Sequence, residues 1–192
     1  MKKEWENIIT DYMQVNPIKI NSGLLCAQKR PRTYWTNINN GDIPQPKDRN
    51  ITVGDILQKG VRTEDYPLSD NEKSIISVVG GETRIKQATK LGYTIANIGD
   101  TINLSCPNSK TRRGRVGVGK CNTLDTNCNY AVYTEEGIRK FTFIEKERLQ
   151  TLPDNYTEGV SDRDRNKMIG NGWTSDVVAY IFSFLPKEWK TK

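Results

Sequence analysis

The sequence predicts an α+β fold, with a helix and strand first, a loop-rich middle and a helix at the C-terminus. Residues 4–14 place apolar side chains at i, i+3, i+4, i+7 and i+8, which is one face of an amphipathic helix. Pro17 ends this helix, and the alternation of apolar and polar residues over 18–21 is typical of a short strand. The apolar run within 176–185 predicts the last helix.

The middle of the chain, residues 38–136, has a different character. Glycine and proline interrupt it at short intervals, so we expect brief elements joined by turns. We predict short helices within 53–57 and 69–79, and strands over 33–37, 94–98 and 130–133.

Composition bounds the class of protein. A hydrophobic fraction of 35% and a mean hydropathy of −0.69 are low for a self-sufficient domain of 192 residues, and a fragment that completes its core against another chain has such a composition. The net charge of +6 favours a polyanionic partner such as DNA, although an ordinary basic protein has the same charge.

Two classes of protein are disfavoured. The sequence has no apolar run near the roughly 20 residues of a membrane span, and Met1-Lys2-Lys3 is followed by acidic residues rather than a signal-peptide core. We therefore expect a cytoplasmic protein. The four cysteines lack Cys-x-x-Cys spacing and the chain has no histidine, so we expect reduced thiols and no metal site.

A basic segment stands out at residues 101–124, which contain no Asp or Glu. Its glycines allow the backbone to approach a groove or a phosphate closely. The segment is either a DNA-contact loop or a solvated basic turn, and its density of cations favours DNA. The cations are Lys110, Arg112, Arg113, Arg115 and Lys120.

A helix start is predicted at Thr142, because Glu145 three residues later completes a capping box. Arg139, Glu145 and Arg148 are expected to form an organising salt-bridge network, and Pro153 to end the element.

Three segments in this order resemble the eighth, ninth and tenth motifs of DNA (cytosine-5) methyltransferases of the bacterial and phage type. The first is the Gln-x-Arg-x-Arg signature in Gln28–Arg32, and the second runs from Arg139 to Asp154. The third is Gly170-Asn171-Gly172-Trp173-Thr174, which leads into the apolar run 177–182. In the second segment Phe143 stands where the family generally has proline.

The resemblance implies three regions. Residues 1–37 would be a remnant of a Rossmann-like catalytic domain, and 38–136 a small irregular target-recognition domain. Residues 137–192 would hold the ninth and tenth motifs, with a C-terminal helix that packs back on the catalytic domain.

The resemblance also implies site residues. Arg30 and Arg32, two apart and so on one side of a strand, would support the flipped cytosine, with Arg32 on its carbonyl oxygen. Gln28 would contact DNA. Taken alone, the arginines are better explained as an ordinary exposed basic pair, and the order of the three motifs reverses this preference.

The tenth motif would hold the cofactor, S-adenosylmethionine. Asn171 and Gly172 are expected to form a tight turn and, with Trp173, to touch the cofactor, although Trp173 is as well explained as a core or interface aromatic. Without a partner, we expect the last helix to expose an apolar patch made of Val178, Ile181, Phe182 and Leu185.

The front half of the family pattern is missing. Nothing in the sequence resembles the glycine-rich cofactor loop, the Pro-Cys nucleophile or the Glu-Asn-Val motif, and Cys106-Pro107 has the reverse order. We therefore expect the DNA-recognition subunit or fragment of a two-chain methyltransferase, from a split or truncated gene in a restriction-modification setting. It would be inactive without its partner. The alternatives are a non-catalytic DNA-binding or regulatory protein and an inactive remnant.

Overall fold

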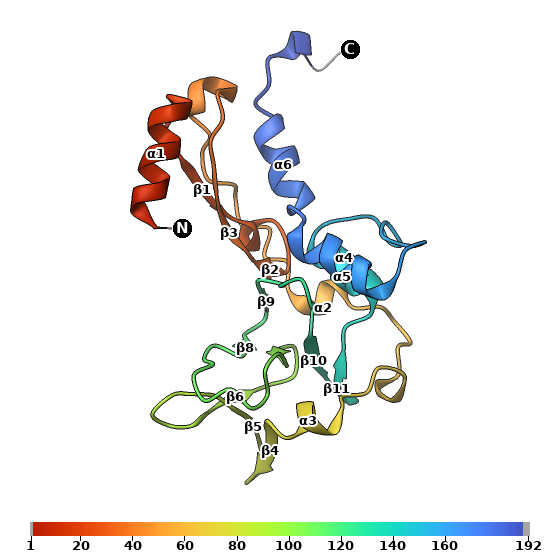
Figure 1. Cartoon of the computed structure of the whole chain (residues 1–192). Helices are drawn as coiled ribbons and strands as arrows, with labels where there is room; N and C mark the ends of the chain where they lie inside the picture. The colour runs from red at the N-terminus through yellow and green to blue at the C-terminus, as the bar shows by residue number, and fades with distance from the viewer. Residues whose placement is uncertain (1, 190–192) are drawn as a thin grey trace.

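The computed structural model describes residues 2–189 and shows helices combined with small sheets (Figure 1). The helices are α1 (Lys3–Met13), α2 (Val53–Ile56), α3 (Asp70–Lys73), α4 (Phe143–Leu149), α5 (Asp162–Asn171) and α6 (Ser175–Phe182). The strands are β1 (Ile18–Asn21), β2 (Gln28–Lys29), β3 (Pro31–Tyr34), β4 (Ile76–Val79), β5 (Glu82–Lys86), β6 (Tyr93–Ala96), β7 (Thr101–Asn103), β8 (Val116–Gly117), β9 (Cys121–Asn122), β10 (Tyr130–Thr134) and β11 (Gly137–Lys140).

The strands form four small sheets, with the orders β1-β3, β2-β9, β4-β5-β6 and β11-β10-β7-β8. Only the β2–β9 pair is parallel among the described residues; the other pairs are antiparallel. This mixture agrees with the predicted α+β class. The Rossmann-like character of the N-terminal segment stays a prediction.

The two ends of the chain pack together. Ile18 and Ile20 of β1 share a buried cluster with Val177 and Ile181 of α6, so the last helix returns to the first strands. Figure 1 shows α1, β1, β3 and α6 at one end of the molecule and the β4–β6 sheet at the other. Ile181 is only 5% exposed, which corrects the predicted exposed patch, whereas Phe182 of the same helix is 54% exposed.

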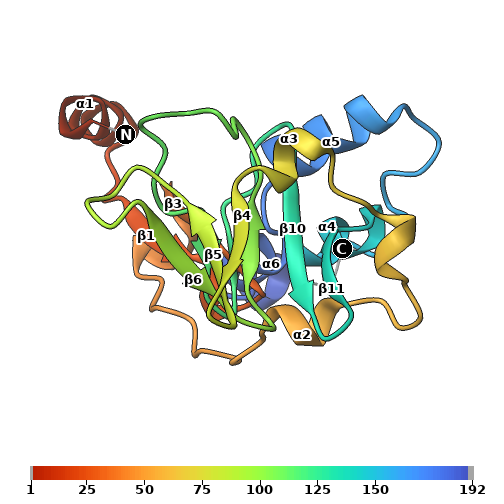
Figure 2. The same ribbon diagram turned by 90° about the horizontal axis from the view of Figure 1, so that it is seen from below.

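Strand β10 joins the two larger cores. Val132 packs in a cluster with Phe141, Leu149 and Ile169, while its neighbour Ala131 belongs to a second cluster on the other face. Successive side chains of a strand point to opposite faces, so one strand serves both cores. Figure 2 shows β10 and β11 beside the β4–β6 sheet.

Helix α1 is attached through its polar side. Glu6 is buried and pairs with Lys19 at 3.0 Å, and the Trp35 indole N–H donates to Thr10 Oγ1 at 3.0 Å. Its apolar side chains face outward: Trp5 is 57% exposed and Tyr12 is 88% exposed. The predicted amphipathic helix is confirmed, but none of its apolar side chains belongs to a buried cluster among residues 2–189.

Several local predictions differ from the structure. The segment 69–79 holds a single helical turn, α3, begun by a capping box at Ser69, and then strand β4, because Ile76 and Val78 pair with β5. The predicted strand at 33–37 ends at Tyr34, where its pairing with β1 stops. Helix α5 was not predicted, since its sequence is mostly charged and lacks an apolar stripe.

The predicted capping box at Thr142 is confirmed. Glu145 bonds back to the Thr142 N–H and accepts a bidentate pair from Arg139, at 2.7 and 2.8 Å, and neither side chain is more than 3% exposed. Arg148 is not part of this pair: it binds Asp154 and the carbonyl of Ile56. The buried pair fixes α4 against the sheet strand β11.

We expect Arg139→Ala to destabilise the chain by about 3–5 kcal/mol, because Glu145 would be left as a buried carboxylate without its cation. Urea denaturation monitored by circular dichroism measures this. As a matched control, Arg62→Ala breaks an exposed pair with Asp65 and should leave the unfolding midpoint unchanged. Equal effects of the two substitutions would refute the importance assigned to the buried pair.

Candidate cofactor and DNA-binding site

Arg30 connects the N-terminal strands to the C-terminal segment. Its guanidinium donates to the carbonyl oxygens of Leu124 at 2.9 Å, Gly170 at 2.6 Å and Gly172 at 3.0 Å. The residue is 4% exposed, so its charge is balanced by carbonyl dipoles rather than by water. Burial lowers the pKa of Arg30, and the nearby Arg32 lowers it further.

Gln150 is a second connector, which the sequence analysis did not single out. Its amide nitrogen donates to Ile169 O at 2.6 Å and to Gly172 O at 3.3 Å. Its amide oxygen accepts from Gln28 Nε2 at 3.2 Å and Thr174 Oγ1 at 2.9 Å. The side chain is fully buried, and no periodicity or charge pattern in the sequence distinguishes it.

Gln28 belongs to the same network. Its amide nitrogen also donates to Leu149 O at 3.0 Å, and its amide oxygen accepts from the Leu124 N–H at 2.8 Å. The residue is 0% exposed, so it cannot reach a DNA backbone in this structure. The predicted DNA contact is therefore replaced by a packing role.

The segment 170–174 is not a tight turn. Gly170 and Asn171 close helix α5, and Gly172 leaves it in an extended conformation with ψ 161°. A Cβ atom on Gly170 would lie 2.3 Å from the carbonyl oxygen of Asp125, so the helix packs there by backbone contact that only glycine permits.

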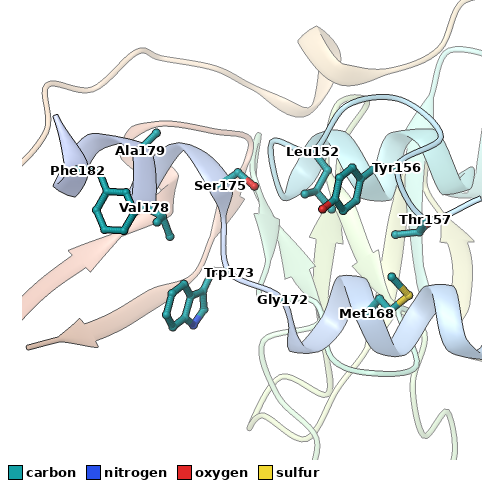
Figure 3. A pocket seen from close by; sticks show the side chains of 10 residues that line it. All are labelled: Leu152, Tyr156, Thr157, Met168, Gly172, Trp173, Ser175, Val178, Ala179 and Phe182. Carbon is teal, nitrogen blue, oxygen red and sulfur yellow. The ribbon is translucent and has the colours of Figure 1, made fainter. Parts of the chain in front are cut away.

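A pocket of about 540 Å³ opens beside this segment (Figure 3). Trp173 and Phe182 lie on one side of it, and Met168 with the loop after α4 on the other, as Figure 3 shows. Gly172 forms part of its floor. Trp173 is 66% exposed, so within this chain it is not a core residue.

Arg32 stands apart from the buried network. It is exposed, and its side chain donates to the neighbouring carbonyl of Pro31 at 2.9 Å. Arg30 and Arg32 therefore differ: the first fixes the fold, and the second presents a free cation. Asn171 is exposed next to Gly172.

The cations of the basic segment 101–124 also include both buried and exposed side chains. Arg115 is 1% exposed and donates to the carbonyls of Asn103, Ser105 and Cys106, so its predicted DNA contact is replaced by support of the loop. Lys120 bonds to the carbonyl of Gly23 and pairs with Asp48. Lys110, Arg112 and Arg113 remain accessible to solvent.

The profile of the C-5 cytosine-specific DNA methylase family matches residues 23–187. The chain belongs to this family. It is also similar to the type II methyltransferase M.Sau3AI of Staphylococcus aureus, with 23% identity over 145 residues, which is 73% of this chain and 33% of the relative. This chain thus spans about a third of that relative's length.

Methylases of this family use S-adenosylmethionine, and the pocket fits one wall of such a site. Its apolar lining suits the uncharged parts of the cofactor, and an indole face such as that of Trp173 is a favourable neighbour for a cation such as the sulfonium. The pocket offers few polar groups, so the charged ends of the cofactor need partners from elsewhere.

The buried cysteines of this chain are poor nucleophiles. Burial raises the pKa of Cys26, and it raises the pKa of Cys128 to about 11, so neither thiol ionises readily near neutral pH. Cys106 is exposed in a loop. Residues 2–189 contain no cluster of side chains suited to a metal ion and no helix able to cross a membrane.

One stretch approaches the missing acid motif. Glu6-Asn7-Ile8 differs from Glu-Asn-Val at a single position, but it lies within helix α1. Hydrogen bonds from Lys3 and Lys19 lower the pKa of Glu6. The carboxylate pairs with Lys3 at 2.8 Å and with Lys19 of β1 at 3.0 Å, so Glu6 anchors the helix to that strand.

We expect Gln150→Ala to cost about 3 kcal/mol of unfolding free energy, because it leaves Gln28, Thr174 and the carbonyl of Gly172 with fewer partners in a dry core. Guanidinium denaturation measures this. Gln45→Ala is the matched control, since the Gln45 side chain is exposed and donates only to Lys19 O. If both variants unfold at the same midpoint, the network does not hold the segment 172–174.

Proposed function

We propose that this chain is the DNA-recognition part of a DNA (cytosine-5) methyltransferase, which transfers methyl groups only with a second polypeptide carrying the nucleophilic Cys and the catalytic Glu. One observation carries the proposal. Gln28, Arg30 and Gln150 tie the three motif segments into one buried network at the edge of the Trp173 pocket.

The pocket supports a shared cofactor site. Asn171, Gly172 and Trp173 would form its wall in this chain, and the partner would supply the glycine-rich loop. The bound cofactor supplies the methyl group. The role of this chain is to hold that wall in a fixed place, which the double hydrogen bond to Gly172 O accomplishes.

Helix α1 provides the argument that a partner protein exists. A helix that buries its acidic residue and exposes Trp5, Ile8 and Tyr12 has its apolar side turned away from the chain. Exposed apolar residues grouped in this way mark a surface that another protein covers. The catalytic half of the enzyme is the partner we assign to it.

The chemistry divides between the chains. The partner's thiolate would add to C6 of a flipped cytosine while its glutamate protonates N3; after methyl transfer to C5, loss of the C5 proton would release the thiolate. Arg32 would donate to the cytosine carbonyl oxygen and keep the ring in place for these steps. Arg30 supports the strand that presents Arg32.

Methyl incorporation from labelled S-adenosylmethionine into DNA tests the function directly. The chain is assayed alone and mixed with a polypeptide that carries the front-half motifs. Activity only in the mixture supports the two-chain enzyme. DNA binding without activity in any mixture would instead favour a non-catalytic DNA-binding protein, and absence of both would indicate an inactive remnant.

In the reconstituted enzyme, Arg32→Ala should lower methylation by about 100-fold or more, as removal of a preorganised donor does elsewhere. Arg32 is exposed, so folding and association of the subunits should be unchanged, which gel filtration checks. Loss of association with Arg32→Ala would show that the residue serves the interface rather than the base.

Arg112→Gln with Arg113→Gln should weaken DNA binding and reduce the slope of log affinity against log salt by about 1.8, the value for two phosphate contacts. Fluorescence anisotropy with a labelled duplex measures the slope. Lys47→Gln with Lys59→Gln removes the same charge from exposed sites elsewhere. Equal slopes for the two double variants would show that this loop does not contact DNA.

A further inference from the structure

A second loop adjoins the basic segment, although it lies some twenty residues earlier in the sequence. The turn between β5 and β6, residues 87–92, is tied to it by hydrogen bonds. The Ala88 N–H donates to Arg112 O at 2.7 Å, and Arg113 Nε donates to Ala88 O at 2.8 Å. The Arg115 N–H reaches Gln87 Oε1 at 3.4 Å. The two loops therefore form one surface.

This two-loop surface is basic. Lys86 and Lys90 of the hairpin are exposed, as are Lys110 and Arg113 of the second loop. In the described part of the chain none of them, nor Arg112, makes an ion pair, whereas Arg84 on the same hairpin pairs with Glu82 at 2.8 Å. Unpaired cations gathered on one surface favour the binding of a polyanion.

An apolar residue lies within this charged surface. Leu91 is 67% exposed at the tip of the turn, between Lys90 and Gly92. Gly92 has φ +81°, and its carbonyl accepts from the Gln87 N–H at 2.9 Å, which closes the turn tightly. The turn lies at the outer edge of the molecule in Figures 1 and 2. Packing within the chain does not explain Leu91.

We propose that the β5–β6 hairpin enters the major groove of duplex DNA, with Lys86 and Lys90 on phosphates and Leu91 on the 5-methyl group of a thymine. The inference rests on the proposed DNA recognition and adds a second reading element to it. A two-stranded ribbon fits the major groove, and an apolar side chain there distinguishes thymine by its methyl group. Leu91 is thus a specificity-determining residue.

The test uses the full chain and a pool of random-sequence duplexes, prepared once with thymine and once with uracil, which lacks the methyl group. The wild-type chain should bind the thymine pool about fourfold more tightly, the value of one methyl contact. Leu91→Ala should bind both pools equally and keep the wild-type salt slope. A thymine preference that survives in Leu91→Ala would overturn the role of Leu91.

The lysines are tested by salt dependence. Lys86→Gln with Lys90→Gln should reduce the slope by about 1.8, whereas Lys47→Gln with Lys59→Gln should leave it unchanged. If wild type binds DNA but the two double variants share one slope, the hairpin inference fails and the proposed function stands. If wild type shows no salt-dependent DNA binding, the proposed DNA recognition fails with it.

Discussion

The carbonyl oxygen of Gly172 accepts hydrogen bonds from the buried side chains of both Arg30 and Gln150, and these bonds fix the segment that joins α5 to α6. A buried guanidinium is costly unless its donors are satisfied. The two terminal nitrogens of Arg30 are satisfied by carbonyl oxygens, two of them at the C-terminal end of α5, where the helix dipole is negative and favours a cation. Among the described residues Nε has no hydrogen-bond partner. A charge that would destabilise most cores thereby fixes the pocket wall at Trp173.

The sequence predicts where the motifs lie, but not which of their residues are buried in the fold. The spacing of Thr142 and Glu145 specified a local capping box, and the periodicity of residues 4–14 specified α1, since both patterns act within a few residues. The burial of Gln28 and Arg115 depends on segments far away in the chain, so a basic or polar residue type could not reveal it. Gln150 was missed for the same reason.

The apolar run of the last helix shows that the sequence also does not reveal which apolar residues stay exposed. Its composition alone left Ile181 and Phe182 equivalent, yet the first packs on β1 and the second faces the pocket. Which residue is buried was decided by the return of α6 to the N-terminal strands. The polar attachment of α1 was equally hidden, because an amphipathic pattern does not say which side meets the protein.

The packing of β1 against α6 also constrains how the chain acquires its structure. Val177 and Ile181, which cover Ile18 and Ile20, lie far later in the sequence. Contacts this distant form slowly, because a long loop must close before they can be made. Strand β1 thus stays uncovered until α6 has been synthesised, and its apolar side chains are open to aggregation during that time.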